Sequence, residues 1–129
     1  MLILIAAVGF TTLALKSYLA RGDSDTLDRL MVVGGFEWDW EMDRNGRIVS
    51  LSYFGDRYTS KCTWELAKLT ELKSLSVGDT NLSVYSIETL LSMDQFEYLD
   101  LGNTELTEAQ LVEFRARNPK CKLVWKKRE

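Results

Sequence analysis

Apolar and polar positions recur with a period of 24 residues between Ile48 and Trp125. Each copy has the form LxxLxL, and its central leucines are Leu51, Leu75, Leu99 and Leu123. A second apolar position follows two residues later, at Tyr53, Val77, Leu101 and Trp125. A third precedes by three residues, at Ile48, Leu72 and Phe96, and Lys120 breaks the pattern in the last copy. A fixed period of this length predicts a supersecondary unit that is repeated and stacked on its neighbours.

The second half of each period has a helical pattern. Ser83 and Thr107 stand where helices would begin, and Thr107 with Gln110 has the form of a capping box. The apolar residues that follow at helical spacing are Ile87, Leu90, Leu111 and Phe114. We therefore expect a strand and then a helix in each repeat, and a final strand over 121–125.

The segment before the repeats predicts a short helix and a hairpin. Leu27, Leu30 and Met31 recur at helical spacing, and Gly34-Gly35 would end that helix. Residues 36–43 then alternate strictly, with Phe36, Trp38, Trp40 and Met42 on one side and Glu37, Asp39, Glu41 and Asp43 on the other. Asn45-Gly46 is a hairpin signal, so this strand should fold back antiparallel on the first strand of the repeats. Such a unit would cap the end of the repeat core.

The N-terminal residues 2–15 are uncharged and mostly apolar. A helix over residues 2–20 would extend roughly 28 Å, close to the thickness of a hydrocarbon core. We favour an uncleaved membrane anchor over a cleaved signal peptide, because no positive region precedes the apolar run and no small-x-small site follows it. A buried core helix is the third reading. Lys16 and Arg21 do not settle which side of the membrane holds the rest of the chain.

These patterns divide the chain into three parts. We expect a transmembrane anchor over 1–21, a cap helix and hairpin strand over 22–46, and repeats over 47–129 that end in an edge strand. Cys62 and Cys121 fall at non-equivalent points of the repeat, so we expect two free thiols rather than a disulfide.

The strand and turn of the second and third copies resemble the leucine-rich repeat family. The copies read Leu72-x-x-Leu75-x-Val77-Gly78-Asp79-Thr80-x-Leu82-Ser83 and Phe96-x-x-Leu99-x-Leu101-Gly102-Asn103-Thr104-x-Leu106-Thr107. The nearest type is the ribonuclease-inhibitor-like one, as a short, bacterial-style, membrane-anchored member. The resemblance implies an α/β fold: a right-handed solenoid with a curved parallel sheet, convex helices and a concave face that binds proteins. It implies no catalytic residues.

The alternation of the predicted strands identifies the residues of that concave face. They are Ser50, Ser52, Ser74, Ser76, Tyr98, Asp100, Lys122 and Val124. This set is mostly polar, and Tyr98 is its largest member. We expect it to be the surface that binds a protein partner, whose identity the residues do not reveal.

Charge is divided unevenly along the chain. Residues 22–60 hold eight acidic and four basic side chains, whereas residues 115–129 hold seven basic and one acidic. A formal net charge of -3 gives no case for nucleic-acid binding. The basic end, with Lys120, Lys122, Lys126, Lys127 and Arg128, would either touch anionic lipid or an acidic partner, or block strand addition at a sheet edge; we favour the last.

The sequence offers little for catalysis. Histidine is absent, which excludes serine–histidine and cysteine–histidine arrangements, and no phosphate-binding glycine motif or CxxC occurs. We therefore expect a non-enzymatic protein without cofactor or metal, tethered to a membrane and binding a protein partner.

The alternative function is a carbohydrate- or cation-binding module. Trp38 and Trp40 would form an aromatic platform for a sugar, and the four hairpin carboxylates would hold a hard cation such as calcium. We favour core cover for the tryptophans and a solvated outer face for the carboxylates, because calcium loops curve around the ion whereas a strand spaces its carboxylates in a row.

Overall fold

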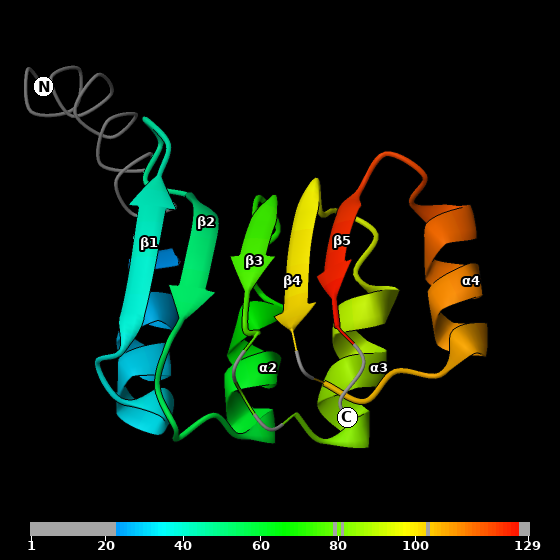
Figure 1. The fold of residues 1–129 in the computed structure, drawn as a ribbon. Helices are drawn as coiled ribbons and strands as arrows, with labels where there is room; N and C mark the ends of the chain where they lie inside the picture. The colour runs from blue at the N-terminus through cyan, green and yellow to red at the C-terminus, as the bar shows by residue number, and fades with distance from the viewer. Residues whose placement is uncertain (1–22, 79, 81, 103, 127–129) are drawn as a thin grey trace, which may run out of the picture.

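The computed structural model describes residues 23–78, 80, 82–102 and 104–126, which form one five-stranded sheet with helices against it. A first helix occupies residues 23–34. The labelled elements are β1 (Trp38–Met42), β2 (Ile48–Tyr53), α2 (Ser60–Leu66), β3 (Ser74–Ser76), α3 (Val84–Ser92), β4 (Tyr98–Gly102), α4 (Glu108–Arg117) and β5 (Lys122–Trp125). The strands lie side by side in chain order, and the first helix, α2 and α3 lie behind them in Figure 1.

Strands β2 to β5 are parallel, and the sequence period sets their register. Leu51 pairs with Leu75, Leu75 with Leu99, and Leu99 with Leu123, so each step along the sheet is one period of 24 residues. The predicted pairing of equivalent leucines is confirmed. Parallel strands need a crossover, and the helical half of each period supplies it.

The core lies between the sheet and the helices. Leu75, Leu99 and Leu101 have no exposed surface, and the other apolar repeat positions of β2 to β4 are also buried. Phe114 of α4 is 1% exposed, and Leu90 of α3 is fully buried. In β5, Leu123 and Trp125 are only half-buried, because no further strand or helix covers that edge in the part of the chain that the structure describes.

The caps of α3 and α4 are those that the sequence predicts. The Ser83 hydroxyl accepts a hydrogen bond from the Ser86 amide. At α4 the Thr107 hydroxyl accepts from the Gln110 amide at 3.1 Å, and the Gln110 side chain accepts from the Thr107 amide at 2.9 Å. This reciprocal pair is the expected capping box, which satisfies two amides that the helix itself leaves unpaired.

The hairpin of β1 and β2 is antiparallel, as predicted, but its apolar side is covered only in part. Trp38 is 3% exposed, whereas Trp40 is 39%, Met42 37% and Phe36 83% exposed. Of the four apolar residues on that side, only Trp38 is buried. Strand β1 is an edge strand, and Phe36 precedes it, so alternation alone overstates how much of this side is covered.

The first helix is attached to this hairpin by a buried carboxylate. Asp23 is 2% exposed and accepts a hydrogen bond from the Ile48 amide at 2.9 Å. It also forms an ion pair with Arg47, with 3.2 Å between Nη1 and Oδ1. Asp23 is itself helical, and its carboxylate holds the start of β2.

Gly78 and Gly102 end equivalent strands for different reasons. Of this pair, only Gly102 has a positive φ, at 46°. A Cβ at Gly102 would lie 2.0 Å from the Gly78 carbonyl oxygen, and a Cβ at Gly78 would lie 2.9 Å from an Asp100 carboxylate oxygen. Close approach to the Gly78 backbone and a left-handed φ therefore both require glycine at Gly102, whereas the near atom at Gly78 belongs to the end of the Asp100 side chain.

The predicted fold class is wrong. The described residues form a small α/β unit with four helices and a five-stranded mixed sheet, rather than a right-handed leucine-rich-repeat solenoid. The sheet is mixed because β1 pairs antiparallel with β2. The sequence period determines the register between neighbouring strands. The architecture of the whole sheet also depends on the number of repeats and on the hairpin at its edge.

The membrane prediction is also contradicted. No helix in the described part of the chain is long and apolar enough to cross a membrane. The expected anchor over 1–21 lies outside the described residues, and we do not retain a single-pass membrane protein.

Candidate binding surface

The helix-free face of the sheet brings together all eight residues of the predicted binding surface. Two rows cross the strands in register. One row consists of Ser50, Ser74, Tyr98 and Lys122, and the other of Ser52, Ser76, Asp100 and Val124. We call these two rows the open face. Lys122 is exposed and the other seven residues are half-buried.

Tyr98 and Asp100 lie near the middle of the open face, on β4. The Asp100 carboxylate is held by two contacts: it accepts from the Gly102 amide at 2.9 Å and from the Ser76 hydroxyl at 3.4 Å. The first contact spans the point where the pairing of β4 with β5 shifts register. These two contacts hold the Asp100 carboxylate in one orientation.

Two hairpin carboxylates extend the open face beyond the predicted set. Asp39 pairs with Ser52 and Glu41 pairs with Ser50, and residues opposite one another in a sheet point to the same side. The open face thus runs from two carboxylates on β1, across the serines and Tyr98, to Lys122 on β5. Sequence alternation separates these carboxylates from the apolar side, but only the pairing of β1 with β2 places them beside the serines.

The hairpin carboxylates do not form a cation site. In the part of the chain that the structure describes, no group of three or more potential metal ligands is close enough to hold an ion. Asp43 accepts from the Asn45 amide at 2.8 Å and from the Arg47 amide at 3.0 Å, and so serves the turn. An Oε atom of Glu37 is buried near Gly35 and Gly55.

Trp38 and Trp40 do not form an aromatic platform. Trp38 packs in a buried cluster, 4.5 Å from Tyr53 and 6.3 Å from Tyr58 between ring centroids. Burial raises the pKa of both tyrosines, so their phenols remain neutral. Trp40 is partly exposed, but it lies on the side opposite the open face and Trp38 is buried, so the two rings do not form one exposed surface.

The basic C-terminal segment lies beside the open face. Lys122 and Lys126 are exposed on and after the edge strand β5, and Lys120 is exposed in the turn before it. Lys127 and Arg128 lie outside the described residues. Lysines on an edge strand oppose pairing with another chain, the role that we favour from the sequence.

Three comparisons with known proteins found no relative of this chain. No family model matches the chain, and no match was found among curated proteins or solved structures. The resemblance to leucine-rich repeats therefore has no support beyond the residues themselves, and two of those residues, Asp79 and Asn103, lie outside the described part.

Proposed function

We propose that this protein is a non-catalytic binding module that recognises a protein partner through the open face. The observation that carries the proposal is the register of β2 to β5, which aligns the eight predicted residues in two rows on the one sheet face without helices. A face with this regular register offers side chains of fixed spacing to a partner. The absence of histidine from the chain is consistent with binding rather than acid–base chemistry.

Tyr98 is the expected centre of the interaction. Tyrosine contributes a large contact area and a hydroxyl at a low cost in side-chain entropy, and interface tyrosines often carry a disproportionate share of the binding energy. On the neighbouring strand β3, the small side chains of Ser74 and Ser76 leave the ring accessible from that side. Asp39 and Glu41 at one margin and Lys122 at the other would orient the partner through complementary charges.

The carbohydrate- or cation-binding alternative is less well supported. It needs two exposed tryptophans on one side or a cluster of carboxylates, and Trp38 is 3% exposed. No observation on the described residues favours it over protein binding.

Photo-crosslinking tests the proposed function. A benzophenone amino acid placed at Ser74 should crosslink a partner in cells of the source organism, whereas the same group at Lys61, on α2, should not. The double variant Tyr98→Ala, Asp100→Ala should abolish the Ser74 crosslink and change the free energy of unfolding by no more than about 1 kcal/mol.

The matched control is Lys61→Ala with Glu71→Ala, which removes two exposed charges away from the open face. It should leave the crosslink unchanged. An equally strong crosslink from the wild type and the Tyr98/Asp100 variant would exclude the open face as the working surface.

A further inference from the structure

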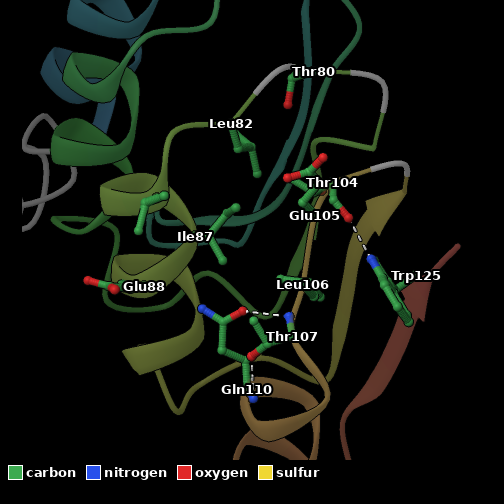
Figure 2. A pocket seen from close by; sticks show the side chains of 11 residues that line it. Thr80, Leu82, Ile87, Glu88, Thr104, Glu105, Leu106, Thr107, Gln110 and Trp125 are labelled. Atoms are coloured by element: carbon green, nitrogen blue, oxygen red, sulfur yellow. Dashed lines mark hydrogen bonds between the residues drawn. The ribbon is translucent and has the colours of Figure 1, made fainter. Parts of the chain in front are cut away.

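A second surface with the properties of a docking site lies away from the open face, between α3 and α4. It is a hollow of about 710 Å³ beyond the C-terminal ends of β3 to β5. Figure 2 shows Ile87 of α3 and Leu106 of the segment before α4 on opposite sides of the opening, with Leu82 above and Trp125 to one side. We call this hollow the α3–α4 groove.

Apart from its two glutamates, the polar side chains that line the groove are hydrogen-bonded within the protein. The Thr80 hydroxyl donates to the Val77 carbonyl at 2.6 Å, and the Thr104 hydroxyl donates to the Leu101 carbonyl. The Trp125 indole donates to the Thr104 carbonyl at 2.6 Å.

Thr107 and Gln110 belong to the capping box of α4, so their side-chain oxygens are engaged as well. The lining therefore exposes both polar atoms and carbon to a ligand. An apolar group entering the groove would contact Leu82, Ile87 and Leu106 without leaving these polar atoms unpaired.

The margin of the groove is acidic. Glu88 and Glu105 line it, both are exposed, and neither forms an ion pair with any residue that the structure describes. Among the described residues, Arg117 is the cation that lines the smaller hollow along α3 and α4. Its guanidinium is engaged by Asp94, Glu113 and the Leu91 carbonyl oxygen, at distances of 3.2, 2.6 and 2.6 Å. The groove therefore favours a cationic neighbour for any apolar group that it holds.

We propose that the α3–α4 groove docks a linear basic segment of a partner protein. The segment inserts a leucine, methionine or phenylalanine between Leu82, Ile87 and Leu106, and a flanking lysine or arginine faces Glu88 and Glu105. An apolar anchor beside complementary charge is how linear motifs commonly bind helical grooves. This site is separate from the open face, and the proposal does not depend on partner binding there.

Titration with designed peptides tests the proposal. The probe is a short amidated peptide of leucine, lysine and alanine with its leucines at helical spacing. Its binding is followed by NMR through the indole N–H signal of Trp125, which Trp125→Phe assigns among the four tryptophans of the chain. The peptide should shift this signal saturably. An isomer with glutamate in place of lysine, and one with serine in place of leucine, should not.

Charge reversal distinguishes the groove from a general attraction of a cationic peptide to an acidic protein. Glu88→Lys with Glu105→Lys should weaken binding at least about tenfold. The control, Asp56→Lys with Glu71→Lys, changes the net charge equally at exposed positions elsewhere and should leave the affinity within about twofold of wild type. All four positions are exposed, so both variants should fold.

Several results would overturn the proposal. Equal weakening by the two reversals would mean that bulk charge alone attracts the peptide, and equal binding of the serine isomer would mean that no apolar anchor is used. Loss of binding in the Tyr98→Ala, Asp100→Ala variant would move the peptide to the open face. Absence of any shift at millimolar peptide would leave the groove without this function.

Discussion

Burial separates the leucines of the repeats from the residues between them. Leu99 has no exposed surface and lies on β4, with a strand on each side. Tyr98 and Asp100, its neighbours in sequence, are half-buried on the other face of the same strand. A one-residue change of register would exchange these faces, so the leucines that form the core also fix which side chains the open face presents.

Leu99→Ala should lower the free energy of unfolding by about 2 to 5 kcal/mol, because it leaves a cavity among side chains that cannot move in to fill it. Chemical denaturation followed by circular dichroism measures the change. Val112→Ala is the control: Val112 is 67% exposed, so its truncation should cost little. A denaturation midpoint for Leu99→Ala equal to that of wild type would contradict the observed packing.

The elements are joined by contacts that sequence periodicity does not reveal. Arg29 of the first helix pairs with Glu65 of α2 at 2.9 Å, and the Gln95 amide group donates to the carbonyls of Leu69 and Leu72 at 2.7 and 2.9 Å. The hairpin depends on Asp23, whose carboxylate reaches β2 from the first helix. Each of these contacts links segments that are more than 20 residues apart.

Asp23→Ala should destabilise the protein by about 1 to 3 kcal/mol, because it leaves the buried Ile48 amide without its acceptor and Arg47 without its partner. The effect should be concentrated at the hairpin and appear as faster amide hydrogen exchange in β1 and β2 than in β4. Asp28→Ala, at an exposed position of the same helix, should change neither quantity. Uniform loss of protection across all strands would argue against a local role for Asp23.

At the scale of the whole molecule, the reactivity of the two cysteines shows whether the elements of the fold open together or separately. Both are free thiols, as the sequence predicts, with Cys62 buried and Cys121 half-buried. Cys62 has no exposed surface, so a reagent reaches it only after the packing between α2 and the sheet opens. Burial also raises the pKa of Cys121, which lowers its thiolate fraction at neutral pH.

A thiol reagent should therefore modify Cys121 first, with a rate that increases as pH rises through the alkaline range, and Cys62 much later. In a Cys121→Ser background, modification of Cys62 should accelerate in Leu99→Ala, although the two sites lie on different elements. Absorbance of the released thiolate measures both rates. Unaltered Cys62 reactivity in Leu99→Ala would show that α2 opens independently of β4.

The sequence predicted well wherever one local rule sufficed. The period matched Leu51, Leu75 and Leu99 across strands, and the capping box at Thr107 needs only residues within one helical turn. The predictions from sequence were wrong where the burial of a residue depends on which elements pack beside it. Trp40 has the same alternation as Trp38, yet Trp40 is 39% exposed, whereas Trp38 packs against Tyr53 and Tyr58. The single-pass membrane protein expected from apolar composition is contradicted as well, because no helix in the described residues is long and apolar enough to cross a membrane.

The sequence by itself determined the strands, their register and the eight residues of the open face, because the alternation and the 24-residue period act on each strand directly. Tertiary structure decided that the sheet is mixed and open, that Asp39 and Glu41 join the open face, and that Glu88 and Glu105 border one hollow. These outcomes require segments distant in sequence to meet. Their physical origin is packing between neighbouring elements, which no periodicity within a single segment specifies.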